Sequence, residues 1–416
     1  MSGLEKLAGL SRYTSYIAPV FVVFLVGAFF LKVDLEPKIT SDFFFSSDSE
    51  IFKKNQKIAD VFPSQQQLLL NVTIDGNIED PAFLAKIETL TARIQALEGV
   101  SGVQSVTSGP PDLQAARENP LWQRLLIGNE EESSFILVFV DTEEFAPLIE
   151  NLEQITKEEQ NDLYQIRLSG LPYIVEQIRR NLTQDMKTFT LGAIVLSALV
   201  LFAVFRSGLI VVGALISCIS AAMLTLIIQS FMGIPIGILT ANLGTIVFVL
   251  TLSHVIFLTS NWCNAARQSK DVKLRETVSN TLPASFWAGV TTLLGFASLI
   301  FVEAKPLNQL GVGGSVGTAA ALICAYTIFP AFLKLATVKP SEITYVFARK
   351  FPQNKKVTRP LSWGIVGLAI VLGVSGTALL KTDPSLLAYF DEGSELHDGL
   401  YYVDKNGGSS PLLYVV

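Results

Sequence analysis

Seven long apolar runs constrain the fold of this 416-residue chain more than any other feature of it. Each approaches the roughly 20 residues that a helix needs to cross the hydrocarbon core of a bilayer. Only 16% of the residues are charged and 50% are hydrophobic, whereas a typical soluble domain has about 25% charged residues. We therefore expect a multi-pass α-helical membrane protein with seven spans, near Tyr13–Leu31, Thr188–Phe205, Gly208–Gln229, Pro235–Thr259, Ser285–Val302, Leu310–Phe332 and Ser362–Leu380.

The loops between the spans predict the orientation of the chain. The first run is too long for a signal-peptide core and lacks a small-residue cleavage site, so we expect a retained anchor. Short cytoplasmic loops carry an excess of lysine and arginine. Basic residues cluster in four loops that lie on one side if the N-terminus is cytoplasmic, and they include Lys6, Arg12, Arg206, Arg267, Lys273, Lys350 and Lys356. The sequence thus predicts an inner-membrane protein whose N-terminus is cytoplasmic.

The polar region between the first two spans is expected to lie outside the cytoplasm, and its acidic residues outnumber its basic ones by about two to one. Alternating apolar residues in "QLLLNVTID" predict a strand, and "VSGVQSVTSG", "SSFILVFVD" and "YQIRLSG" predict further strands. Amphipathic stretches at 81–100 and near 146–159 predict helices between them. We expect an α/β domain of the ferredoxin-like, split βαβ type. Cys218, Cys263 and Cys324 lie in or beside spans and are expected to be unpaired.

The C-terminal segment resembles the segment after the first span. Lys32-x-Asp34 matches Lys381-x-Asp383, and Ser49-Glu50 matches Ser394-Glu395. We therefore expect this chain to be the N-terminal part of a longer polypeptide with an internal repeat, whose second half packs against it. The predicted division is a cytoplasmic N-terminus (1–12), span one (13–33), the extracytoplasmic domain (34–186), a five-span block (187–335), a basic linker (336–360), span seven (361–380) and the start of a second outer domain (381–416).

Two stretches of sequence carry a family resemblance. "SGLPYIVEQIRRNLTQDM" (169–186) leads into span two, and "TTLLGFASLIFVEAKPLNQLGVGGSVGTAAALICAYTIFPAFLKL" (291–335) covers spans five and six. Together with the layout and the repeat, they resemble the resistance-nodulation-division (RND) superfamily, in its MmpL and Patched-like branch. The resemblance implies a secondary active exporter, driven by the proton-motive force, that moves a hydrophobic or lipid-like molecule.

Span four contains "VLTLSHVIFLTSNW" (249–262), with one of only two histidines in the chain. Gly244, Thr251, His254 and Asn261 follow one another at spacings that place them on a single stripe of a helix. An ionisable side chain in such a stripe predicts a functional site, and histidine titrates near neutral pH. Comparison with the family places Ser253 where relatives carry an intramembrane aspartate. We predict a proton relay of His254, Ser253 and Thr251; the alternative is that His254 is a packing residue.

Three further sets of residues have both a functional and an ordinary structural interpretation. Within the membrane, Asn242, Thr291 and Thr292 are candidates for hydrogen bonds between spans, although each threonine can instead bond its own helix backbone. Asp185, at the entry of span two, either couples the outer domain to the membrane or is an interfacial charge that favours the helix start. The aromatic residues near the end of span one either border the substrate route or anchor the interface: Phe43, Phe44 and Phe45.

Several function classes are disfavoured. The chain shows no metal-ligand spacing and no nucleophile-base pattern, so we expect no enzyme activity, no cofactor and no metal. The acidic outer domain disfavours nucleic acid as a partner. A non-pumping lipid or sterol sensor and an accessory to protein translocation remain alternatives, and proton-insensitive lipid binding would favour the sensor. The expected partners are the membrane, a lipid or other hydrophobic small molecule, and the second half of the polypeptide, and the sequence leaves homo-oligomerisation open.

Overall fold

The computed structural model describes residues 14–38, 66–74, 76–128, 132–142, 144–265, 269–336 and 355–379. The chain divides into two compact units. We call residues 57–180 and 374–416 the sheet unit, and residues 1–56 and 181–373 the helical unit.

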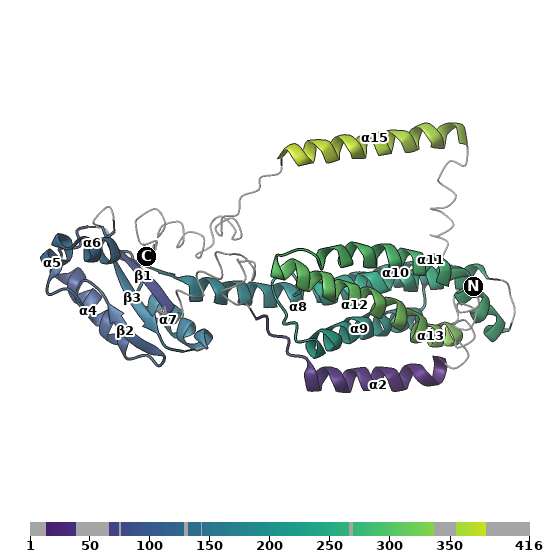
Figure 1. The fold of residues 1–416 in the computed structure, drawn as a ribbon, viewed down its shortest axis with the longest axis horizontal. Helices are drawn as coiled ribbons and strands as arrows, with labels where there is room; N and C mark the ends of the chain where they lie inside the picture. The colour runs from purple at the N-terminus through teal and green to yellow at the C-terminus, as the bar shows by residue number, and fades with distance from the viewer. Residues whose placement is uncertain are drawn as a thin grey trace. The chain divides into compact units, whose positions relative to one another are not determined.

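The sheet unit contains a four-stranded antiparallel sheet in the order β2-β3-β1-β4 (Figure 1). Strand β1 is central and pairs with β3 from Gln66 to Thr73 and with β4 from Leu69 to Ile74. Strand β3 separates β1 from β2, and β1 separates β3 from β4, so neither β-α-β connection joins neighbouring strands. The strands predicted from the sequence are all present, at β1 (Gln66–Ile74), β2 (Val100–Gln104), β3 (Ser133–Val140) and β4 (Tyr164–Ser169).

Helices α4 (Pro81–Gln95) and α7 (Phe145–Glu159) connect the strands as predicted, and the short helices α5 (Leu113–Glu118) and α6 (Pro120–Leu126) precede β3. The start of α4 is well specified by sequence. The Asp80 side chain accepts a hydrogen bond from the backbone N–H of Ala82 at 2.9 Å, and Pro81 occupies the first turn, where its missing N–H costs nothing.

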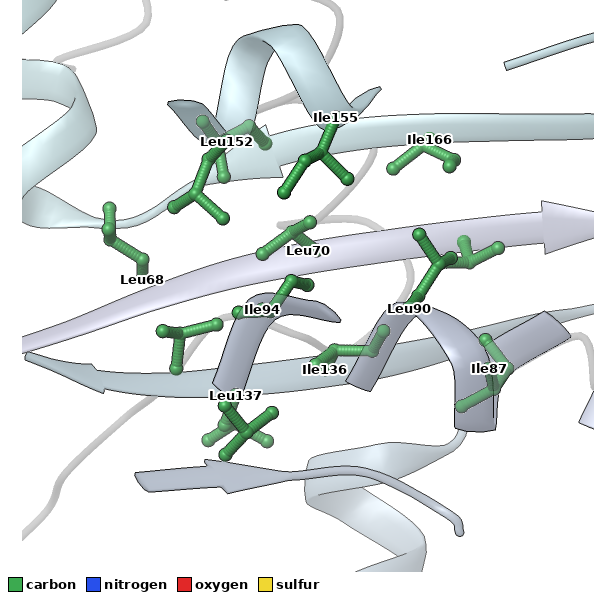
Figure 2. Close-up of a cluster of buried hydrophobic side chains, with 14 of the residues drawn as sticks. Leu68, Leu70, Ile87, Leu90, Ile94, Ile136, Leu137, Leu152, Ile155 and Ile166 are labelled. Atoms are coloured by element: carbon green, nitrogen blue, oxygen red, sulfur yellow. The ribbon is translucent and has the colours of Figure 1, made fainter. Parts of the chain in front are cut away.

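A single apolar core joins these helices to the sheet. Helix α4 buries residues at intervals of three and four, as an amphipathic helix should. Figure 2 shows Ile87, Leu90 and Ile94 of α4 and Leu152 and Ile155 of α7 gathered with side chains of the central strands. Burial of each such side chain stabilises the fold by roughly 1.5–3 kcal/mol before the entropy cost.

Gly170 ends β4 and allows α8 to begin at once. Its φ is +117°, a conformation that other residues rarely adopt, and a Cβ atom on it would lie 2.7 Å from the carbonyl oxygen of Gln67 in β1. Helix α8 (Leu171–Phe205) then runs for 35 residues without interruption, about 50 Å at the α-helical rise. It therefore contributes its first turns to the sheet unit and the remainder to the helical unit.

Among the described residues, five helical segments are long and apolar enough to cross a membrane. Shorter apolar segments, Ala18–Lys32 and Val366–Gly376, belong to α2 and α15. Helices α9, α10, α11 and α12 pack against one another, and α2 packs on α9 (Figure 1). The elements are α2 (Thr14–Lys32), α8, α9 (Gly208–Phe231), α10 (Leu243–Asn264), α11 (Lys270–Leu299), α12 (Lys305–Thr327) with α13 (Phe329–Leu335), and α15 (Lys355–Leu379).

One predicted span boundary was wrong. Helix α10 starts at Leu243 and not at Pro235, because Gly233 ends α9 with a φ of +68° and a turn follows. In that turn the Thr240 hydroxyl accepts a hydrogen bond from the Gly237 N–H at 2.7 Å. Helix α11 begins at Lys270 and so extends beyond the predicted span, which starts at Ser285; apolar content marks only the part of a helix expected in lipid and not its polar first turns.

Small residues let the helices approach closely. A Cβ atom on Gly317 of α12 would overlap Cγ2 of Val247 in α10, and one on Gly314 would overlap the ring of Phe296 in α11. The small residues of "GVGGSVG" (311–317) thus form the surface on which α12 packs closely against its neighbouring helices.

Candidate functional site

The polar stripe of α10 faces neighbouring helices as predicted. His254 is only 5% exposed and Thr251 is fully buried. The Thr251 hydroxyl donates to the Val247 carbonyl at 2.7 Å, whereas the Nδ1 atom of His254 is buried and has no hydrogen-bond partner among the described residues. A buried polar atom without a partner is costly, so it is rarely retained without a function or an additional binding partner.

Ser253 lies on a different face from His254. Its side chain is exposed, and its hydroxyl donates to the Leu250 carbonyl at 2.7 Å. The position at which relatives would carry an aspartate is therefore free to meet a further protein surface or lipid. The structure brings Thr251 and His254 together on the packed face of α10 and leaves Ser253 outside it.

Contacts between helices fix their relative register around His254. The Asn261 side chain of α10 donates to the Thr281 hydroxyl of α11 at 2.9 Å, and Val247 lies against Gly317 of α12. At a rise of about 1.5 Å per residue, these two pairs place Ser285 and Tyr326 within about one helical turn of the level of His254.

Ser285 and Tyr326 extend the polar character of this level. The Ser285 hydroxyl of α11 and the Tyr326 hydroxyl of α12 are both buried and interact with each other, but within the described part of the chain neither makes a well-formed hydrogen bond. The Thr277 hydroxyl, two turns away on α11, is buried and has no hydrogen-bond partner among the described residues. Three packed helices thus contribute buried polar atoms to one end of the block. Buried water molecules or a hydrated proton can form hydrogen bonds with such atoms.

The predicted supporting residues behave differently from one another. Asn242 is the N-cap residue of α10, and its Oδ1 atom is buried without a described partner. Thr291 is exposed and Thr292 is half-buried, and each donates to the Ala288 carbonyl of its own helix. Each hydroxyl therefore bonds its own helix backbone and not span four, as in the alternative interpretation. Asn261 and Thr281 make the connection between these spans instead.

The remaining candidates lie away from this stripe. Asp185 is exposed on α8, which fits either of its two predicted roles. Phe43, Phe44 and Phe45 lie outside the described residues, so their place on a substrate route stays a prediction. Cys218, Cys263 and Cys324 are unpaired, as expected. Among the described residues no group of three or more histidine, cysteine or acidic side chains could hold a metal ion.

Two polar features were missed in the sequence. Gln229, in the last turns of α9, is 3% exposed, and its Nε2 atom has no partner among the described residues. A lone amide in the apolar run "LTLIIQSF" was the available signal. The other feature is an ion network at the start of α8, where Arg180 contacts both Glu153 and Glu176.

Comparison with solved structures shows the fold. The hedgehog release protein Disp from the water bear Hypsibius dujardini is similar to this chain, with a TM-score of 0.55 and 12% sequence identity. The match covers 80% of this chain and 49% of that one, so the chain spans about half the length of this relative. No curated protein sequence matches. The family model described as "MMPL family" matches residues 44–371. With this match over most of its length, the chain belongs to the MMPL family.

Proposed function

We propose that the protein is an RND-type secondary active transporter, not an enzyme, that uses the proton-motive force to export a hydrophobic or lipid-like molecule. The observation that carries the proposal is His254, a titratable side chain buried among α10, α11 and α12 with an unpartnered Nδ1 atom. A proton taken up there would need a new hydrogen-bond acceptor, and the resulting rearrangement would alter the packing of these helices.

The proposed topology has seven spans, with α2 and α15 added to the five long segments, an N-terminus in the cytoplasm of an inner membrane and an extracytoplasmic sheet unit. The strand order β2-β3-β1-β4, with a helix in each β-α-β connection, supports a ferredoxin-like assignment for this unit. The second half of the polypeptide would lie against the exposed face of α10 that carries Ser253, and would supply the acidic partner that spans two to four lack.

Transport in vesicles tests this proposal. The full-length protein, reconstituted with fluorescent fatty-acid or phospholipid analogues, should move them when a proton gradient is imposed and stop when a protonophore collapses it. His254→Gln keeps a polar side chain of similar length but cannot titrate, so coupling should be lost while the protein still folds. Thr291→Val, which changes an exposed side chain of α11, is the matched control and should transport normally.

The alternatives predict other outcomes. A non-pumping lipid or sterol sensor would bind the same analogues with no response to the gradient. An accessory to protein translocation would leave the analogues unmoved and alter secretion of a precursor protein. Normal gradient-driven transport by His254→Gln would remove His254 from the coupling mechanism.

A further inference from the structure

Three hydroxyl side chains form a row along one face of α11. Thr277, Thr281 and Ser285 are spaced four residues apart, so successive members lie one helical turn from each other on the same face. Each is only 1% exposed. We propose that this α11 hydroxyl row carries protons between His254 and the end of the helical unit where α10 stops and α11 starts. The inference rests on the proposed proton coupling and names the residues that serve it.

One end of the row lies close to His254. Helices α10 and α11 are joined by a short loop and pack against each other, so they run antiparallel. The Asn261 amide donates to the Thr281 hydroxyl at 2.9 Å, which fixes their register. At the helical rise, Ser285 is then about 5 Å from the level of His254 along the axis. The Nδ1 atom of His254 has no partner among the described residues and needs one in order to exchange a proton.

The other end of the row lies at a charged surface. By the same register, Thr277 is level with the last residues of α10. Near this end the Lys273 ammonium lies 4.8 Å from the centre of the Trp262 ring, and Lys334 pairs with Asp271 at 2.6 Å. The row therefore leads from the polar stripe of α10 to a surface that the proposed topology places in the cytoplasm.

Hydroxyl groups suit proton transfer because each can donate one hydrogen bond and accept two. Neighbouring hydroxyls of the row are about 6 Å apart along the axis, a gap that one water molecule can bridge. Buried water usually occupies places where polar groups lack a protein partner, and the Thr277 and Ser285 hydroxyls make no well-formed hydrogen bond within the described residues. Each hydroxyl accepts a proton on one side and releases its own on the other, so the row is unchanged after each transfer.

The surroundings of the row favour a proton over a metal cation. No aspartate, glutamate, lysine or arginine occurs at positions 208–231 of α9, 243–264 of α10, 277–299 of α11 or 306–327 of α12. A metal cation would therefore meet no opposite charge there. Besides His254, the titratable side chains in these segments are neutral near pH 7, and they are Tyr326, Cys218, Cys263 and Cys324.

Thr281 is the point at which the row is closed in this structure. Its hydroxyl donates to the Thr277 carbonyl at 2.6 Å and accepts from Asn261, so it can accept only one further hydrogen bond. Pro283 lies two residues further along α11 and has no backbone N–H to donate, and helices bend at such points. Release of Thr281 from Asn261, with bending of α11 at Pro283, would open the row.

Silver-ion accessibility tests the route without relying on transport. Ag⁺ is close in size to a water molecule and binds thiols. The full-length protein carries Ser285→Cys in a Cys263→Ser background, and Ag⁺ is added to one side of sealed membrane vesicles before denaturation and maleimide labelling. Ag⁺ should protect this thiol only from the side of the α10–α11 loop. Ser217→Cys is the matched control and should stay unprotected, because Ser217 is fully buried and its hydroxyl is bonded to the Gly213 carbonyl at 2.7 Å.

Variants of Thr281 test whether the row carries protons. Thr281→Val keeps the shape of the side chain without the hydroxyl, so Ag⁺ protection of Ser285→Cys should disappear and gradient-driven transport should slow by at least about tenfold. Thr281→Ser should restore both. An unprotected Ser285→Cys, equal protection from both sides, or normal transport by Thr281→Val would overturn the inference and leave gradient-driven transport intact. Wild-type transport that ignores the gradient would overturn the proposed function as well, so the two failures are distinguishable.

Discussion

The close approach of α12 to α10 depends on single hydrogen atoms at glycine positions. A Cβ atom on Gly317 would overlap Val247 and would also lie 3.4 Å from Cγ2 of Thr225 in α9. We expect Gly317→Ala to destabilise the protein by about 1–3 kcal/mol, because the helices must separate to admit the methyl group. Thermal unfolding of the detergent-solubilised protein measures the loss.

The control for this substitution is Gly295→Ala in α11, where an added Cβ atom would meet nothing within 4 Å. Alanine favours a helix over glycine by about 1 kcal/mol, so this variant should be unchanged or slightly more stable. If both variants lowered the melting temperature equally, close packing at Gly317 would not be the cause.

The stripe on α10 was predictable because a spacing of seven, three and seven places residues on one helix face whatever the fold. The positions of Thr291 and Thr292 were not. Helix α11 is apolar on most sides, so its sequence does not reveal which face meets protein and which meets lipid. The burial of Gln229 and the position of Tyr326 at the same height as His254 depend on the register between helices that are far apart in the sequence. No local sequence pattern encodes that register.

At the scale of elements, an ion network joins α7 to the first turns of α8. Arg180 bonds Glu153 at 2.8 and 2.9 Å and Glu176 at 2.8 Å, and Arg179 also bonds Glu176 at 2.8 Å. The Glu176 side chain is 6% exposed. Burial acts to raise the pKa of Glu176, but the hydrogen bonds and charges of Arg179 and Arg180 outweigh it, and the net pKa is lowered.

Because the pKa of Glu176 is lowered in the folded state, its ion pairs contribute fully to stability at pH values above the ordinary pKa of glutamate. This contribution is lost as the pH falls through the pKa that Glu176 has in the folded protein. Glu176→Gln should destabilise the sheet unit by about 1–3 kcal/mol at pH 7 and weaken its response to acid. Hydrogen–deuterium exchange of residues 145–180 at pH 7 and about pH 4, corrected for intrinsic exchange, measures both effects. Glu98→Gln serves as control, and an equal acid response in Glu176→Gln and wild type would contradict the prediction.

Whole strands and helices were predicted better than their ends. Alternating residues identified β1, and a continuous apolar run identified β3, which is buried along nearly its whole length. The amphipathic stretch from Pro81 correctly placed the start of α4. The start of α10 was missed because "GIPIGILT" is apolar enough to pass for a span. Its backbone is turned by Gly233 and by the Thr240 hydroxyl, and hydropathy does not register either effect.

For the whole molecule, the distribution of basic residues predicts that the sheet unit and the loop between α10 and α11 lie on opposite sides of the membrane. This follows from the odd number of spans that separates them when α8 begins outside. Glu98 and Ser269 are exposed positions in these two regions, so single cysteines there can report the side on which each lies. Cys218 and Cys324 are buried and need no replacement, whereas Cys263 is replaced by serine.

A membrane-impermeant maleimide, applied to intact cells, should label Glu98→Cys at once and Ser269→Cys only after permeabilisation. The Cys263→Ser background without an added cysteine should remain unlabelled. Labelling of Ser269→Cys in intact cells, with Glu98→Cys protected, would invert the topology. The proton that reaches His254 would then have to enter from the other side of the membrane, and this result would contradict the proposed export driven by the proton-motive force.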